Sequence, residues 1–551
     1  MARKVQIMLL IALAFFNAEA WAQESFGGSP RSFKSKISEN VPVIELSHFD
    51  NDALLAEDML NADNGNPLRI GVSHMVNYNM DNCGTVNVLP NGDKIWRVAF
   101  KSPDAANIEV SFSKFLIPDG ADLFMYNETH DYVIGSYNVR NTMEGNIFYA
   151  EAIPGDVIYL EYYEPQGAKF HGELTVDMIG HLYRGILRSA SGSCACEINV
   201  ACSEGDPFRK QIHSVVNIEM TMYNGNVFSC SGAMINNVRN DHTLYMLSAE
   251  HCYDNYKTWK FYYNNQTTTC NASTGMPGFT ATGAELKAKG NSGTSSDFLL
   301  MKITGTIPYY VRDSVYFAGW SNSSVTPTVG CCIHHPAGDY KKISIPQSVS
   351  SSISRNKFWE VRWKTTNNKG VTEGGSSGSP LLNANGLIVG SLCCGSSGCQ
   401  PGGCGPSSDP NIQGLSGKDY YGRLDYAWTN GNDYASGGSN NLKRWLDPDN
   451  TGATTHYGLF YSELTAIHDT YILNCSVSPN PTSGMVTISG SFDNPQGLCR
   501  VFDLMGRQIY TQNVMLSNST EINLGHLSEG LYMLEIQNAG KLSRSKLIIS
   551  R

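Results

Sequence analysis

Charged residues are scarce in this 551-residue chain, because Asp, Glu, Lys and Arg supply only 16% of it, against about 25% in typical soluble domains. Basic residues are also in the minority, since 40 Lys and Arg face 50 Asp and Glu, a formal net charge of −10. Nucleic-acid binding needs a basic face for the phosphates, so this balance argues against such a partner. The hydrophobic fraction of 41% is enough to fill cores and excludes wholesale disorder.

Long hydrophobic runs are missing beyond the N-terminus. Residues 1–22 contain two early basic residues, an apolar run from Val5 to Phe16, and small residues at Ala20 and Ala22. This layout is typical of a secretory signal peptide and predicts cleavage before Gln23. A membrane anchor is the alternative, but the run is too short for about 30 Å of hydrocarbon. We expect an exported mature protein without a transmembrane segment.

Cysteine is nearly absent from residues 23–188, where only Cys83 occurs. Strand-like alternation at 94–100, 108–112 and 157–163, separated by turn residues, predicts an antiparallel sandwich or barrel. No cluster of candidate catalytic groups occurs there.

Twelve of the 15 cysteines lie instead between Cys194 and Cys404, which favours an oxidising compartment. A short helix pattern at 441–448, stopped by proline, follows. We therefore expect a mainly β protein with a domain at 23–188, a second at 189–463, a linker at 464–474 and a small third domain at 475–551.

A glycine-rich turn at residues 374–380, GGSSGSP, is the strongest candidate for chemistry. A nucleophilic serine needs a tight turn that exposes its hydroxyl and aims backbone N–H groups at the developing oxyanion. A flexible loop is the alternative for this run considered alone. Two other segments favour catalysis: His251 stands beside Cys252, and Asp297 enters an apolar strand. The order His251, Asp297, Ser377 is that of chymotrypsin-type double β-barrels, not of α/β-hydrolases.

Residues of about 189–460 resemble the lysyl endopeptidases, a secreted bacterial branch of the trypsin-like serine peptidases. The matching segments are GSC at 192–194 through CSEGD at 202–206, SAEHC at 248–252, SDF at 296–298, IHHP at 333–336, GVTEGGSSGSP at 370–380 and WLDP at 445–448.

The resemblance implies a role for each matching residue. Ser377 would attack the scissile carbonyl, His251 would act as general base and then acid, and Asp297 would orient the imidazole. The N–H groups of Gly375 and Ser377 would form the oxyanion hole. No cofactor and no metal are implied, and the partners would be protein or peptide substrates of a monomeric enzyme.

The pocket for the substrate side chain is expected at Asp419. Val371 occupies the position, six before the nucleophile, where many trypsin-like enzymes carry an aspartate. In the lysyl endopeptidases the aspartate of an Asp-x-Tyr-Gly segment sits at the pocket base, and Asp419 matches it. A carboxylate presented from that strand should leave a shallow cationic slot. Such a slot would suit the slim ammonium of lysine better than a guanidinium. Asp409 and Asp425 are alternative candidates for the pocket base. Another alternative is that Asp419 only caps a turn.

Cys393 departs from the family, which has histidine there, so the substrate-binding surface near Cys393 is expected to differ. A lysine-specific enzyme, an arginine-tolerant or mixed one, and a catalytically inactive surface adhesin remain the three hypotheses. By family position, Cys230–Cys252, Cys202–Cys270 and Cys196–Cys399 should be disulfides. Six further cysteines could form three more bridges of unknown pairing: Cys194, Cys331, Cys332, Cys393, Cys394 and Cys404. The run CCIHH at 331–335 could bind a metal by ligand type, but disulfides and structural histidines are favoured there.

The flanking domains also carry resemblances. Residues 23–188 resemble the pro-region of this family, with Arg184 and Arg188 as possible processing points before residue 191. Residues 475–551 resemble the type IX secretion sorting domain, with a small carbohydrate-binding sandwich as the alternative. The carriers are SPNPTSG at 478–484, FDLMGR at 502–507, LSEGLY at 527–532 and the end KLSRSKLII at 541–549. The implied location is secreted or attached to the outer-membrane surface, reached through the periplasm with the type IX machinery as partner.

Overall fold

The computed structural model describes residues 25–550 except 26, 34–36, 38–39, 62–66, 143–144, 186–192, 254–255, 277, 353–355, 365–368, 401–402, 407–416, 432–439, 464–472, 474, 493, 504–507 and 539–540. The predicted signal peptide, most of the predicted linker, Arg188 and Asp409 lie outside the described residues.

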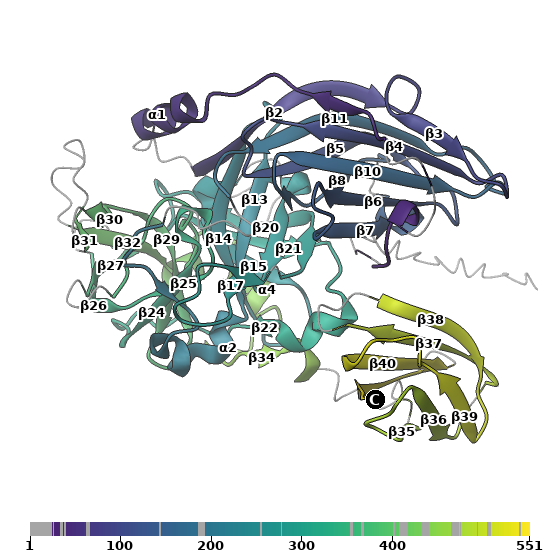
Figure 1. The fold of residues 1–551 in the computed structure, drawn as a ribbon. Helices are drawn as coiled ribbons and strands as arrows, with labels where there is room; N and C mark the ends of the chain where they lie inside the picture. The colour runs from purple at the N-terminus through teal and green to yellow at the C-terminus, as the bar shows by residue number, and fades with distance from the viewer. Residues whose placement is uncertain are drawn as a thin grey trace, which may run out of the picture.

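Two facing sheets form the N-terminal region (Figure 1). Their apolar sides enclose one core, with Val98 and Leu160 from the first sheet and Val110 and Ile179 from the second. The predicted sandwich-like fold of this region is confirmed. The first sheet contains β1 (Val43–Glu45), β3 (Thr85–Val88), β4 (Lys94–Lys101), β6 (Asp122–Asn127), β7 (Val133–Tyr137) and β10 (Val157–Glu164), and the second contains β2 (Leu68–Asn79), β5 (Asn107–Leu116), β8 (Phe148–Tyr149), β9 (Ile153–Pro154) and β11 (Glu173–Leu182); helix α1 spans Asn51–Asn61.

The middle of the chain folds into two β-barrels. The first follows the pairing order β19-β16-β13-β14-β15-β21-β20 around buried Ile218, Met246 and Leu299. Its strands are β13 (Val215–Thr221), β14 (Val227–Met234), β15 (Tyr245–Ser248), β16 (Lys260–Tyr263), β19 (Thr280–Thr282), β20 (Ala284–Gly290) and β21 (Phe298–Ile303).

The second barrel follows the order β12-β25-β24-β28-β29-β32-β27-β26. A shared apolar cluster joins the two barrels, with Leu247 and Leu300 from the first and Ile333 and Ile388 from the second. The double-barrel fold predicted from motif order is therefore confirmed. Its strands are β12 (Ile198–Asn199), β24 (Val329–His334), β25 (Lys342–Ser344), β26 (Pro346–Ser351), β27 (Phe358–Trp363), β28 (Pro380–Asn383), β29 (Ile388–Gly395) and β32 (Lys418–Arg423).

Short elements complete the middle region, and the helix predicted at 441–448 is present as α4, although only one turn long. They are α2 (Arg209–Ile212), α3 (Leu424–Ala427), α4 (Lys443–Leu446), β17 (Gln266–Thr267), β18 (Gly275–Met276), β22 (Tyr316–Phe317), β23 (Trp320–Ser321), β30 (Ser397–Gln400), β31 (Gly403–Pro406), β33 (Thr455–His456) and β34 (Leu459–Phe460).

One sheet crosses from the N-terminal region into the first barrel. Strand β2 pairs with β14 in antiparallel fashion, with Leu68 opposite Ser229 and Gly71 opposite Val227. The result is a twelve-stranded sheet shared by two regions that the sequence presents as separate. Figure 1 shows β2, β11 and β5 beside β13 and β14.

The C-terminal region is a small sandwich of two sheets over buried residues such as Ile488, Val501 and Leu534. In the part of the chain that the structure describes, no helix has the length and apolarity needed to span a membrane. One sheet contains β35 (Cys475–Ser478), β36 (Met485–Gly490) and β39 (Ser519–Asn523), and the other contains β37 (Gln496–Phe502), β38 (Gln508–Met515), β40 (Gly530–Asn538) and β41 (Lys541–Ile549).

Candidate active site

His251 and Asp297 meet between two neighbouring strands of the first barrel. His251 follows β15 in a 3₁₀ turn, and Asp297 directly precedes β21, the strand that pairs with β15. The Nδ1 atom of His251 lies 2.7 Å from Oδ2 of Asp297, and the His251 N–H donates to Oδ1 at 3.0 Å. Burial lowers the pKa of His251, but the Asp297 carboxylate outweighs it and raises that pKa above its usual value.

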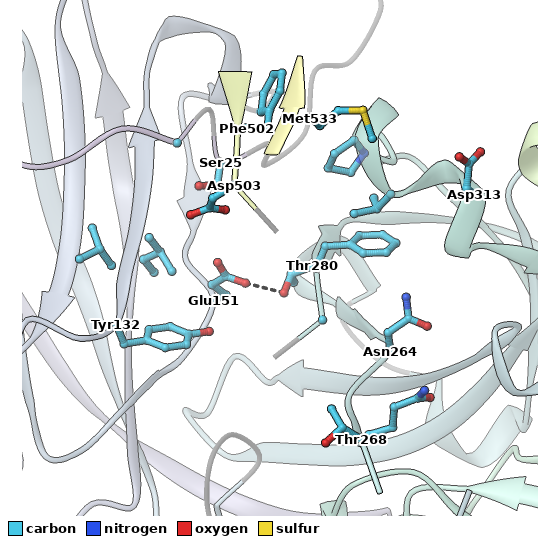
Figure 2. A pocket seen from close by; sticks show the side chains of 18 of the residues that line it. Ser25, Tyr132, Glu151, Asn264, Thr268, Thr280, Asp313, Phe502, Asp503 and Met533 are labelled. Carbon is cyan, nitrogen blue, oxygen red and sulfur yellow. Dashed lines mark hydrogen bonds between the residues drawn. The ribbon is translucent and has the colours of Figure 1, made fainter. Parts of the chain in front are cut away.

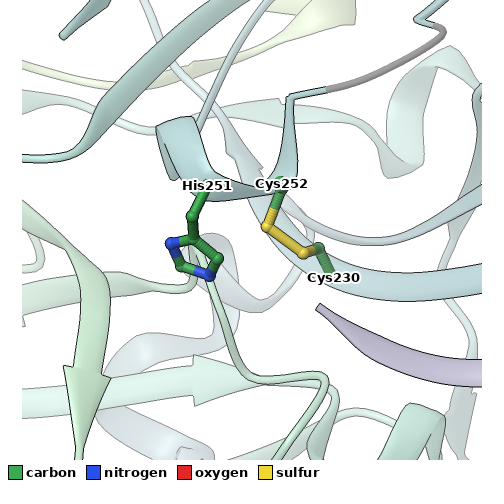
Figure 3. A group of neighbouring side chains, drawn as sticks. All are labelled: Cys230, His251 and Cys252. Atoms are coloured by element: carbon green, nitrogen blue, oxygen red, sulfur yellow. A yellow bond between two sulfur atoms is a disulfide. The ribbon is translucent and has the colours of Figure 1, made fainter. Parts of the chain in front are cut away.

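A disulfide braces the histidine. Cys252 is bonded to Cys230 on β14, and Figure 3 shows this bridge beside the imidazole of His251. Atoms of metal-ligand type on these three residues lie within 4.8 Å of one another. Because both sulfur atoms are bonded to each other, neither is a thiolate that could bind a metal.

The glycine-rich turn that contains Ser377, the candidate nucleophile, is held against strand β14. Ser231, which follows Cys230, donates its N–H to the carbonyl of Ser377 at 2.8 Å and its hydroxyl to the carbonyl of Gly375 at 2.9 Å. Gly375 has φ 88°, a conformation that favours glycine. Ser231 therefore fixes the turn on the side of the barrel that carries Cys230 and His251.

A buried polar network lies behind the turn. The Nδ1 atom of His334 is 2.7 Å from the Ser376 hydroxyl, and Nε2 is 2.9 Å from the Ser344 hydroxyl and 3.5 Å from Glu197. Burial lowers the pKa of His334 to about 3 and raises that of Glu197 to about 8. Both groups are therefore held neutral at neutral pH, and His334 links strand β24 to the residue before the nucleophile.

Asp419 is fully buried, with its carboxylate surrounded by neutral donors. The hydroxyls of Thr372 and Ser397 donate to Oδ2 at 2.6 and 2.5 Å, the indole N–H of Trp363 donates to the same oxygen, and the Ser397 N–H donates to Oδ1 at 3.2 Å. Burial raises the pKa of Asp419, while these donors oppose the rise. Gly395 leaves no room for a side chain, because a Cβ there would lie 1.7 Å from Oδ1.

The sequence did not single out Thr372, Ser397, Trp363 or Gly395. Thr372 stands five residues before Ser377, and Trp363 ends the strand that pairs with the Asp419 strand. Asp425 is engaged elsewhere, since it accepts from the guanidinium of Arg423 at 2.9 Å.

Cys393 lies beside Asp297. The pKa of its thiol is raised well above the usual value by the adjacent Cys394, by burial and by Asp297, and its sulfur is 2.9 Å from that of Cys394.

The cysteines depart in part from the expected bridges. Cys202–Cys270 is a second disulfide, and Cys194 and Cys196 are also disulfide-bonded; the side chains of Cys399 and Cys404 lie outside the described residues. The suggestion of three further bridges is wrong, because Cys331, Cys332, Cys393 and Cys394 are thiols. Cys331 and Cys332 are neighbours on β24, where adjacent side chains point to opposite faces, and the Cys332 sulfur faces the Ser379 hydroxyl.

A cavity of about 1110 Å³ lies away from this site (Figure 2). Its walls come from the N-terminal region, the first barrel and the C-terminal sandwich, as Tyr132, Thr280 and Met533 show. The described residues that line it do not include His251, Asp297 or Ser377.

Comparison with known proteins agrees with this geometry. Residues 190–412 match the family model "Lysyl endopeptidase, C-terminal domain". The resemblance to the lysyl endopeptidases is thus confirmed for this segment. A stretch of 263 residues is 27% identical to the lysyl endopeptidase of Pseudomonas aeruginosa, covering 43% of this chain and 54% of that protein. The chain therefore spans about half the length of this lysyl endopeptidase.

Residues 476–550 match the model "Secretion system C-terminal sorting domain", which indicates an exported protein. Solved structures similar to the chain include a serine endoprotease from Yersinia pestis, at 13% identity and TM-score 0.27 over 63% of this chain and 97% of that one. Another is a Glu endopeptidase, at 18% identity and TM-score 0.26 over 42% of this chain and 92% of that one.

Proposed function

We propose that this chain is a secreted serine endopeptidase that cuts polypeptides after lysine through an acyl-enzyme and is made as a zymogen. The observation that carries the proposal is the hydrogen-bonded pair His251–Asp297 beside the anchored turn of Ser377. An adhesin that only retained the fold would need neither this pair nor the turn.

The proposed mechanism gives each of these groups one role. Neutral His251 takes the proton of the Ser377 hydroxyl as the oxygen attacks the scissile carbonyl, and Asp297 stabilises the imidazolium that forms. His251 then protonates the leaving amine. In the second half, His251 takes a proton from a water molecule as the water attacks the acyl carbonyl, and it returns this proton to the Ser377 oxygen as the acyl–oxygen bond breaks. The N–H groups of Gly375 and Ser377 are proposed to bind the oxyanion, and removing one such donor typically lowers turnover by about 10²–10³-fold.

Lysine preference is proposed to come from Asp419. Its Oδ2 is already bonded to three neutral donors, while Oδ1 has the longer bond to Ser397 and faces Gly395. A slim ammonium, which can bind through one oxygen, suits a carboxylate whose Oδ2 is already occupied better than a guanidinium, which binds a carboxylate through two parallel bonds. Asp419→Ser tests the assignment, and unchanged cleavage after basic residues would contradict it.

The regions on either side are proposed to serve processing and export. We assign residues 23–188 to a pro-domain, 189–463 to the peptidase and 475–551 to the type IX sorting domain of a monomeric enzyme. Arg184 is a poor processing point, because its N–H is bonded to the Ile70 carbonyl and its guanidinium to Asp58. Cleavage nearer Arg188 is therefore favoured, by another protease or by an enzyme that tolerates arginine.

The decisive experiment is digestion of a denatured proteome by the processed protein and by its Ser377→Ala variant. Mass spectrometry would identify each new C-terminus. Termini at lysine that are absent with Ser377→Ala support the proposal, and comparable lysine and arginine termini support the mixed-preference alternative. No cleavage, together with no labelling by a serine-directed fluorophosphonate, would favour the inactive adhesin.

A further inference from the structure

The edge of β14 that leads into the candidate active site is occupied by the N-terminal region. Strand β2 begins at Leu68, opposite Ser229, and Ser229 directly precedes the bridged Cys230. Leu68 is thus the residue of β2 nearest the catalytic end of β14. The backbone groups of this edge, which an extended polypeptide could use, are already paired.

Leu68 also reaches the nucleophile turn. A Cβ built on Gly374 would lie 3.1 Å from Cδ1 of Leu68 and 3.5 Å from its Cβ. Gly374 directly precedes Gly375, the proposed oxyanion donor. The Leu68 side chain therefore packs against the turn that contains the proposed nucleophile and oxyanion donors.

Buried interactions away from the cleft hold this arrangement together. The ammonium of Lys260 on β16 contacts Glu219 of β13 at 2.5 Å and also Glu109 of the N-terminal strand β5. The hydroxyl of Tyr262 donates to Glu219 at 2.8 Å. Val227 and Tyr262 of the first barrel belong to the same apolar cluster as the N-terminal core.

We propose that β2 is an inhibitory strand, which blocks the proposed peptidase by pairing with β14 and placing Leu68 over Gly374. The inference rests on the proposed function and specifies its regulation. Because the contacts are non-covalent and buried, cutting the chain after the N-terminal region does not by itself relieve the inhibition. The strand must also leave the edge of β14.

The test compares intact chains that differ at Leu68. Initial rates are measured on a quenched fluorescent peptide with one lysine followed by at least three residues, and mass spectrometry verifies that each chain is intact. Leu68→Ala should hydrolyse the peptide about tenfold faster than the wild-type chain, since the loss of its apolar contact weakens the blocked state. Leu60→Ala is the matched control, because Leu60 is 85% exposed in the same region, and it should match wild type.

After removal of the N-terminal region, all three proteins should show the same rate. If processed wild type cleaves the peptide but intact Leu68→Ala is no faster than Leu60→Ala, the inhibitory role of β2 is wrong and the proposed function stands. If processed wild type does not cleave, the proposed function fails and the inference with it.

A second variant covers the case in which Leu68→Ala does not fold. Gly374→Ala changes the other partner of this contact, because the added methyl group would crowd Leu68. It should raise the ratio of intact to processed activity, and an unchanged ratio would contradict the inference.

Discussion

In the proposed mechanism, Asp297 acts on catalysis through the charge it presents to His251. Asp297→Asn should lower kcat by about 10⁴-fold, because the amide no longer holds the correct tautomer or stabilises the imidazolium. Activity requires neutral His251, so it rises as pH increases through a pKa that Asp297 holds above its usual value. The acidic limb of the pH–rate profile should therefore move to lower pH in Asp297→Asn. Asp449→Asn, on an exposed pair with Arg239, is the control and should leave the profile unchanged.

Trp363 donates one hydrogen bond to Asp419, the proposed base of the substrate pocket. Trp363→Phe keeps the aromatic bulk but removes the N–H, so the pKa of Asp419, which burial already raises, should rise further. Hydrogen bonds to charged groups are worth about 1.5–3 kcal/mol, which corresponds to a loss of about tenfold or more in kcat/KM for lysyl substrates. Measurement at several pH values checks the cause, because the loss should shrink as pH rises. A loss independent of pH would contradict it.

At the scale of elements, β24 supports the turn of Ser377, the proposed nucleophile, through the contact of His334 with Ser376. His334→Ala leaves the buried Ser344 and Ser376 hydroxyls without this partner. We expect a loss of about 1–3 kcal/mol in the free energy of unfolding and a lower kcat with little change in KM. His334→Asn, which can restore one hydrogen bond, should recover part of both. Thermal unfolding and active-site titration separate loss of folded protein from slower turnover.

At the scale of the whole molecule, the N-terminal region joins the peptidase through a buried charge cluster. Burial and the neighbouring Glu219 raise the pKa of Glu109 to about 8, although Lys260 opposes the rise. Glu219 and Lys260 stay charged in the assembled protein, as the directions of their pKa shifts indicate, and Tyr262 stays neutral.

The sign of the resulting pH dependence follows from Glu109. A carboxyl group whose pKa rises on assembly takes up a proton. Its stabilising contribution to the assembled state is therefore complete below the ordinary pKa of 4.5 and is lost as pH rises to about 8. After the chain is cut, dissociation of the N-terminal region should increase across this window by at most about tenfold per pH unit. Size-exclusion chromatography at successive pH values measures it. Glu109→Gln should flatten the dependence, and an equally steep response in that variant would contradict the assignment.

The sequence alone determined the fold class and the candidate catalytic residues. Motif order and the small residues around Ser377 depend on local chemistry, and the alternation at 94–100 and 157–163 depends on the period of a strand; such patterns can be read directly. The bridge predicted for Cys230 and Cys252 came from family position, and the structure contains it. The expectation of three further bridges was wrong, because Cys331, Cys332, Cys393 and Cys394 are thiols, although Cys194 is disulfide-bonded. Residue spacing does not show where the side chains of neighbouring cysteines point.

Only the tertiary structure decided which distant groups meet. The donors around Asp419 come from three separate strands or loops, and the partners of His334 come from segments on either side of it in the chain. The pairing of β2 with β14 joins residues about 160 positions apart, and no local pattern at Leu68 encodes it. Such contacts arise when two sheets bury apolar and charged surfaces against each other, which depends on the packing of the whole chain.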